Sequence, residues 1–267
     1  YIFPYIHQTN LAGTDVNASL LLWSGFIDYK TDFLRLVGEI QHMPWGELTG
    51  LRSLGLPNNK ADIEAGNVIF AARAEIYPGF PVKMAALEFG YAGGDEINPA
   101  KDGGDFQGNI NAFSPAYNID NLLFKHMIPT IYGLENSVIN AYYIRAWGTV
   151  KLLDNLSFTP HVLFAWNQER QALVEPNFFP GESGKVDRFL GAELEGTVTV
   201  NIVPGVDFDL IGSVVIPGQG LDDLTEQRAA LRVDPTGATS PRNFDAPDAP
   251  FAIQGRLMVY IDQFFKK

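Results

Sequence analysis

The sequence predicts an all-β protein that folds as an antiparallel, up-and-down transmembrane β-barrel, with about 10 strands in this chain. Three observations support this prediction. Apolar and polar residues alternate over many segments, most of these segments exceed the roughly 5–6 residues of an ordinary soluble strand, and short links alternate with long links. We expect one domain over residues 1–267.

The clearest alternation covers residues 189–216. Leu194 and Val198 share one parity, whereas Glu193 and Glu195 share the other. Successive side chains of a strand point to opposite faces, so the segment is predicted to be a hairpin with one apolar and one acidic face. An apolar face of this kind either packs in a protein core or contacts lipid.

Ten segments show the pattern, the first of them weakly. In chain order they are 1–8, 16–28, 32–42, 67–77, 82–91, 138–152, 155–167, 186–202, 205–216 and 250–265. Most reach the roughly 9–11 residues that a membrane-spanning strand needs. Their apolar parities lack charge in mid-strand, as expected where a facing Arg or Lys would cost roughly 2–4 kcal/mol in lipid.

The opposite parity of each hairpin is polar. Arg35 and Glu39 oppose Leu34, Leu36, Gly38 and Ile40 in 32–42, and Arg73 and Glu75 alternate with apolar residues in 67–77. Aromatic residues gather near the strand ends, as in the girdles of membrane barrels. They are Trp23, Phe26, Tyr29, Tyr77, Phe80, Tyr91, Trp166, Phe264 and Phe265.

The links predict the orientation. Four are short (29–31, 78–81, 153–154 and 203–204) and alternate with four long ones (43–66, 92–137, 168–185 and 217–249). Outer-membrane barrels have short periplasmic turns and long extracellular loops. We therefore expect both termini to be periplasmic.

Composition narrows the function. The chain has 19 Lys+Arg against 31 Asp+Glu, a formal charge of −12, which argues against nucleic-acid binding. It has no cysteine, which excludes disulfides and thiol chemistry. Tyr1 opens no signal peptide and begins inside a predicted strand. We expect a processed or truncated chain, whose whole barrel could have 12–18 strands.

Twelve charged residues fall on the inward parity and are predicted to line the pore: Arg35, Glu39, Arg73, Glu75, Glu88, Arg145, Lys151, Glu193, Glu195, Asp207, Asp209 and Arg256. They either line a water-filled channel and set ion preference, or pair with one another and fill the lumen. Glu193, Glu195, Asp207 and Asp209 occupy one hairpin, and we expect this acidic cluster to be the selectivity element.

The 92–137 link is too long for a bare loop. We expect it either to fold into the barrel as a constriction or to pack over the outer mouth. Its candidate residues are Asp120, Lys125 and His126.

The sequence predicts no enzyme, no metal site and no cofactor. The four histidines lie in separate segments without metal-ligand spacing, and no G-x-S-x-G motif occurs.

The last segment, FAIQGRLMVYIDQFFKK, resembles the C-terminal signature of bacterial outer-membrane proteins, an amphipathic strand that ends on an aromatic residue. Two lysines follow Phe265, a departure from that signature. The hairpin LGAELEGTVTVNIVPGVDFDLIGSVVIPG resembles those of alginate-export-type porins of Gram-negative bacteria. The resemblance implies the class of protein and no alginate-binding residue.

The predicted function is an outer-membrane channel, or porin, for passive diffusion of ions or small hydrophilic solutes. The first alternative is a structural or partner-holding barrel without conductance, and the second is a soluble β-barrel or sandwich that binds a ligand. Expected partners are membrane lipid, lipopolysaccharide, the solutes, and either further copies of the chain or an exported protein.

Overall fold

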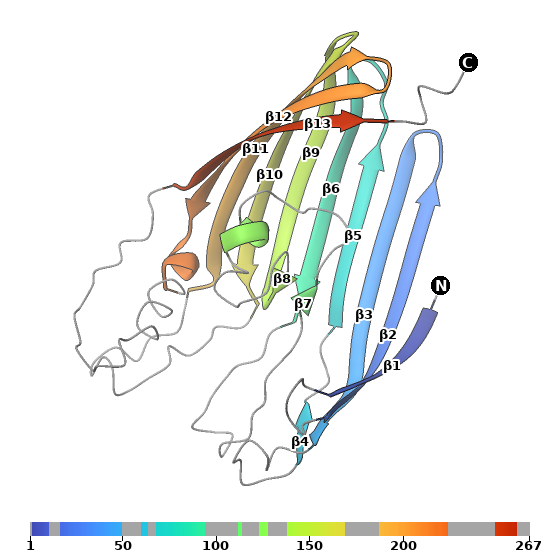
Figure 1. Cartoon of the computed structure of the whole chain (residues 1–267), viewed down its shortest axis with the longest axis vertical. Coiled ribbons are helices and arrows are strands. Elements are labelled where there is room, and N and C mark those ends of the chain that lie inside the picture. The colour runs from blue at the N-terminus through green and yellow to red at the C-terminus, as the bar shows by residue number, and fades with distance from the viewer. Residues whose placement is uncertain are drawn as a thin grey trace, which may run out of the picture.

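The computed structural model describes residues 2–10, 17–49, 60–63, 68–93, 112–113, 123–127, 138–168, 187–223 and 249–260. They form an all-β structure in which one 11-stranded antiparallel sheet dominates (Figure 1). Its path is β1-β2-β3-β5-β6-β9-β10-β11-β12-β13, with β4 paired to β3 off that path. Each strand of the path therefore pairs with its neighbours in sequence, which confirms the up-and-down topology.

The strands follow the predicted segments closely. Along the path they are β1 (Ile2–Asn10), β2 (Asn17–Lys30), β3 (Leu34–Thr49), β5 (Val68–Ile76), β6 (Val82–Ala92), β9 (Ala141–Leu153), β10 (Leu156–Asn167), β11 (Phe189–Val203), β12 (Val206–Pro217) and β13 (Phe251–Val259). The smaller strands are β4 (Lys60–Ile63), β7 (Ala112–Phe113) and β8 (Val138–Ile139), and η2 (Leu123–Met127) is a π-helical turn.

The short turns all lie at one end of the sheet, the upper end in Figure 1. They join β2 to β3, β5 to β6, β9 to β10 and β11 to β12. Gly205 in the last of them has a φ of 85°, a left-handed conformation that glycine adopts without steric cost. The predicted alternation of short and long links is confirmed.

The predicted loop 43–66 was wrong in part. β3 continues to Thr49 along β2, and β4 pairs with its end. The register of β2 and β3 shifts between Leu21 and Trp23, where residues 43 and 44 have no partner of their own. Pro44 therefore lies at a bulge, a position that tolerates proline inside a strand. It interrupted the alternation without ending the strand.

The sheet is open in the described residues. β1 pairs with β2 and β13 pairs with β12, and no register joins β1 to β13. Figure 1 shows these two strands at opposite edges of a curved sheet. The predicted closed barrel is therefore absent from this part of the chain, because the ten strands of the path do not meet around a circle.

The strand registers separate two faces, because directly opposed residues of an antiparallel pair lie on the same face. One face, the apolar face, includes the row Leu36, Ala74, Leu87, Ala146, Val162, Leu194 and Val214. The other, the polar face, includes the row Val37, Arg73, Glu88, Arg145, Leu163, Glu193 and Val215.

The buried hydrophobic cluster lies on the polar face, away from the short turns. It includes Tyr143, Leu163 and Val215 from the sheet together with Leu123 and Phe124 from η2. The 92–137 segment thus contributes residues that pack against the polar face, whereas the apolar face remains largely uncovered.

Candidate functional site

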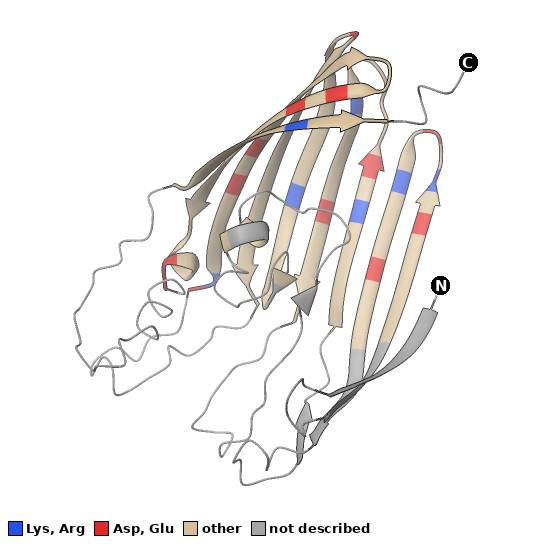
Figure 2. Cartoon of the chain, viewed as in Figure 1, with Lys and Arg blue, Asp and Glu red and all other residues tan. Residues whose placement is uncertain are grey.

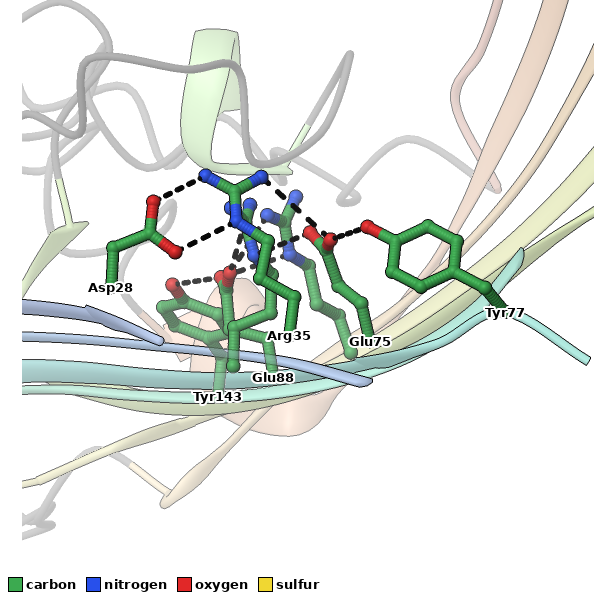
Figure 3. A network of polar contacts seen from close by, with 8 residues as sticks. Asp28, Arg35, Glu75, Tyr77, Glu88 and Tyr143 are labelled. Atoms are coloured by element: carbon green, nitrogen blue, oxygen red, sulfur yellow. Dashed lines mark hydrogen bonds and ion pairs between the residues drawn. The ribbon is translucent and has the colours of Figure 1, made fainter. Parts of the chain in front are cut away.

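The candidate site is a band of ion pairs across the polar face, the charged belt. Its members are Asp28, Arg35, Arg73, Glu75, Glu88 and Arg145. They come from β2, β3, β5, β6 and β9, and strand alternation directs all of them to the same side of the sheet. Figure 3 shows these side chains rising together on the side where η2 lies.

Arg35 begins the belt with two contacts to one carboxylate. Its Nε donates to Asp28 Oδ1 at 2.9 Å and its NH2 to Asp28 Oδ2 at 2.7 Å. Its NH1 lies 3.7 Å from Glu75 Oε2. The planar guanidinium therefore bridges acids from β2 and β5, a geometry that suits arginine better than lysine.

Glu75 and Arg73 continue the belt on β5. Arg73 Nε lies 3.0 Å from Glu75 Oε1, and its NH1 lies 4.0 Å from Glu88 Oε2. The Tyr77 hydroxyl donates to Glu75 Oε2. Glu75 is buried and Arg73 is half-buried, so little solvent screens their interaction.

Glu88 is the most buried member of the belt. It is fully buried, and Arg145 contacts both of its oxygens, through Nε at 2.9 Å and NH2 at 3.0 Å. The Tyr143 hydroxyl donates to Glu88 Oε1 at 2.7 Å. A buried carboxylate needs this number of donors, because leaving one charge uncompensated would cost several kcal/mol, roughly 3–5.

Aromatic and imidazole groups extend the belt beyond Arg145. Arg145 Cζ lies 4.5 Å from the centroid of the Trp147 ring, and the His161 ring is nearly perpendicular to that ring, with centroids 6.2 Å apart. His161 Nδ1 lies 3.9 Å from Glu195 Oε2. Polar contacts thus cross the sheet from β2 to β11.

The belt itself has equal numbers of positive and negative groups. Three carboxylates (Asp28, Glu75 and Glu88) face three guanidinium groups (Arg35, Arg73 and Arg145) in alternating order. Alternation of this kind favours neither cations nor anions at the belt as a whole. Removal of one member would leave a net charge of known sign.

All twelve predicted pore-lining residues lie on the polar face, as their registers show. Figure 2 shows charged positions on most of the long strands from β2 to β13. Arg35, Arg73, Glu75, Glu88 and Arg145 belong to the belt. The remainder (Glu39, Lys151, Glu193, Glu195, Asp207, Asp209 and Arg256) have other partners.

Most of those partners lie on the same strand or on an adjacent one. Gln41 donates to Glu39 at 3.0 Å, Lys151 contacts Asp154 at 2.8 Å, and Asn201 donates to Asp207 at 2.5 Å. Arg256 NH2 donates to Asp209 at 2.6 Å, and the Thr199 hydroxyl donates to the same carboxylate at 2.7 Å. Two of these contacts pair opposite charges, Lys151 with Asp154 and Arg256 with Asp209, and the others are hydrogen bonds from neutral donors.

The predicted four-acid cluster was wrong. Glu195 lies opposite Ser213, whereas Asp209 lies opposite Thr199, four residues further along β11. At about 3.3 Å per residue these positions are roughly 13 Å apart. The two glutamates and the two aspartates therefore belong to separate sites, and the expected repulsion among all four does not arise.

Of the three candidate residues of the 92–137 segment, the structure describes two. Lys125 and His126 belong to η2, whose Leu123 and Phe124 pack in the hydrophobic cluster of the polar face. Asp120 lies outside the described residues.

Sequence reasoning missed Asp28, Tyr77, Tyr143, Trp147 and His161 as members of this site. Tyr143 and Trp147 share the parity of Arg145, so the alternation carried the signal. Asp28, directly opposite Val37, lies on the same face. Uncharged donors and aromatic rings on the same parity complete the network.

Two carboxyl groups outside the sheet strands titrate abnormally. The Lys151 ammonium donates to Asp154 in the turn after β9 and lowers the pKa of that carboxyl. At residues 219–223, which form one helical turn, burial and the neighbouring Asp223 raise the pKa of Asp222. The charge of Asp222 is thus disfavoured in the folded chain.

The apolar face is exposed and uncharged from β5 to β13. In those strands, none of the described positions that the registers place on this face is Asp, Glu, Lys or Arg, whereas Glu47 near the end of β3 pairs with Ser19 at a position of this face. Lys83 lies in the register shift beside a short turn. The face exposes large side chains, including Ile27, Leu36, Ile40, Leu87, Ile144, Leu194, Leu210, Ile216, Ile253 and Leu257.

Within the described residues, no helix is long and apolar enough to cross a membrane. The same residues contain no group of three or more His, Asp or Glu side chains arranged to hold a metal ion. No protein-family model matches the chain, and no curated protein matches it.

Proposed function

We propose that this chain forms part of the wall of an outer-membrane β-barrel, and that ions or small hydrophilic solutes diffuse passively through this barrel. One observation carries the proposal: from β5 to β13 the sheet has an extended, exposed face without a charged residue in its paired positions, and an opposite face with ion pairs. Soluble proteins rarely expose an apolar patch larger than a few hundred Å². A membrane is the solvent that such a face suits.

The dimensions of the apolar face support the proposal. On β9 the outward side chains run from Tyr142 to Leu152, ten residue steps apart. At about 3.4 Å per step this is roughly 34 Å along the strand. With a strand tilt of about 40° the height becomes roughly 26 Å, close to the about 25 Å apolar band of outer-membrane barrels.

A row of aromatic residues near one end of the sheet supports the placement of a membrane boundary there. Phe70, Tyr91, Tyr142, Trp166 and Phe189 follow one another across β5, β6, β9, β10 and β11 at the end opposite the short turns. Adjacent rings stack, with centroids 5.6 Å apart for Phe70 and Tyr91 and 5.3 Å apart for Tyr142 and Trp166. Such girdles lie at the interface between lipid and water.

The polar face supplies the wall of an aqueous path in this proposal. Its carboxylates and guanidinium groups present both signs of charge to a passing solute. With short turns in the periplasm, both termini are periplasmic and the long links face lipopolysaccharide, in keeping with the resemblance of the last strand to outer-membrane proteins.

The open edges set a requirement for this function. Unpaired strand groups are not tolerated in lipid, so β1 and β13 have to be paired in the membrane. We propose a larger closed barrel of about 12–18 strands, completed by further strands of the polypeptide or by another copy.

A barrel without conductance is the second candidate. The observation that favours it is the apolar cluster on the polar face, in which η2 packs against Tyr143, Leu163 and Val215. Together with the internally compensated belt, this packing fills part of the space that a channel would need. Such a barrel would serve a structural or partner-holding role.

Conductance in planar lipid bilayers tests the proposal, with protein extracted in detergent from the outer membrane. The expected result is heat-modifiable migration on gels and discrete current steps. An intact, heat-modifiable barrel that gives no current would establish the non-conducting alternative. A protein that remains monomeric and soluble without detergent would overturn the membrane proposal altogether.

A further inference from the structure

The turn η2 is attached to the polar face by a hydrogen bond. The backbone N–H of Leu123 donates to Glu193 Oε2 at 2.8 Å, across 70 residues of sequence. Glu193 and Leu123 are both fully buried. A hydrogen bond to a charged acceptor in such surroundings is among the stronger ones in proteins.

A second attachment is aromatic. The Phe124 ring lies with its centroid 5.6 Å from that of Tyr143, tilted by 56°. Tyr143 in turn donates its hydroxyl to Glu88, the most buried carboxylate of the charged belt. The contact therefore joins η2 to the belt through one side chain.

We infer that Glu193 and Tyr143 are positioning residues that hold residues 123–127 as a plug against the polar face. The claim that this plug restricts solute flow rests on the proposed channel function. The claim that η2 is attached to the polar face does not rest on it, because the contacts exist whether or not the barrel conducts. The two claims can therefore be tested separately.

The plug depends on Glu193 for a physical reason. When the carboxylate is removed, the buried N–H of Leu123 loses this acceptor, and an unsatisfied buried donor is costly. Release of η2 to water restores a partner to that N–H. The population of released η2 is therefore expected to rise by about tenfold or more in Glu193→Ala.

Thiol labelling measures the release without any need for current. The chain has no cysteine, so Leu123→Cys introduces a unique thiol and keeps the backbone donor. The full-length protein is labelled with a polar maleimide in detergent, and Glu193→Ala, Glu193→Gln and Tyr143→Leu are added to this background. Thr197→Ala, on the same face of β11, is the matched control.

The expected result is labelling about tenfold or more faster for Glu193→Ala and Tyr143→Leu than for the background. Glu193→Gln keeps an acceptor oxygen and should label close to the background rate, as should Thr197→Ala. Equal rates in Glu193→Ala and Thr197→Ala would overturn the positioning role of Glu193.

Hydrogen exchange provides a second, independent test of the attachment of η2. If Glu193→Ala does not fold by heat-modifiable migration, hydrogen exchange of the unsubstituted protein decides, because the Leu123 N–H should exchange far more slowly than in an unstructured peptide. Exchange at the unstructured rate would overturn the plug.

Conductance of the same variants separates the two proposals. A larger current in Glu193→Ala and Tyr143→Leu supports both. Faster labelling with no current in any variant supports the plug and overturns the channel.

Discussion

The ring of Tyr143 on β9 lies across Gly90 on β6, in the space that a larger residue at position 90 would occupy. The two residues are directly opposed, and a Cβ built on Gly90 would overlap the tyrosine ring. This close approach lets the Tyr143 hydroxyl reach Glu88 while the ring contacts Phe124.

Gly90→Ala is therefore expected to destabilise the protein by about 1–3 kcal/mol, because overpacking displaces the tyrosine. Urea unfolding in detergent micelles or lipid would measure the difference. Gly212→Ala is the matched control, since a Cβ built there meets no atom within 4 Å. Equal stability of the two variants would contradict the assigned packing.

For the Glu88–Arg145 pair we expect the stability changes of substitutions at the two positions to be non-additive. Arg145→Met removes the guanidinium that contacts both oxygens of a fully buried carboxylate, at an expected cost of about 3–5 kcal/mol. Adding Glu88→Gln removes the uncompensated charge, so the double variant should be less destabilised than the sum of the single ones. A strictly additive double-mutant cycle would show that the two residues do not interact.

The charged belt predicts a change of ion selectivity in the proposed channel. Glu75→Gln leaves three arginines facing two carboxylates, a net positive charge on the belt. The reversal potential in a salt gradient should shift toward anions relative to the unsubstituted protein. Asp154→Asn, in an exposed turn, is the control and should shift it less. A shift toward cations would contradict the placement of Glu75 in the path.

The sequence predicted the faces of the sheet better than its contacts. Period-two alternation assigned Arg73, Glu88 and Glu193 to one face. This assignment is robust, because a slip of one residue would move every side chain of a strand to the opposite face. It could not predict the pairs, since the partner of Glu88 depends on the register of β6 against β9. The same limit produced the mistaken grouping of Glu195 with Asp209.

Two other features depend on tertiary structure. Pro44 breaks the alternation, yet the bulge against β2 accommodates it within β3. The position of η2 follows from the packing of Leu123 and Phe124 in a cluster with distant residues of the sheet, such as Leu163 and Val215. No local periodicity indicates such a contact.

The raised pKa of Asp222 predicts a pH-dependent stability. Because the folded chain binds this proton more tightly than the unfolded chain, the contribution is present below the unfolded value of 3.8 and is lost as pH rises through the folded value. Asp222→Asn should therefore stabilise the protein at pH 7 and have little effect at pH 3, as measured by chemical unfolding. Asp223→Asn is the control: Asp223 accepts bonds from the Asp187 N–H and Gln219, so its loss should destabilise. Equal effects of Asp222→Asn at both pH values would contradict the assignment.

A charge on the apolar face gives the sharpest test of the membrane proposal. Leu210 is 48 % exposed near the middle of β12, directly opposite Val198. In water an arginine at such an exposed site would change stability by no more than about 0.5 kcal/mol, whereas near the bilayer midplane it would cost about 2–4 kcal/mol. Thr197→Arg, at the same height on the polar face, provides the comparison. Unfolding from lipid vesicles should show Leu210→Arg to be the more destabilised of the two by roughly 2 kcal/mol or more. If Leu210→Arg instead unfolds at the same denaturant concentration as the unsubstituted protein, the apolar face does not contact lipid, and the exposed leucines and isoleucines must be covered by another protein surface.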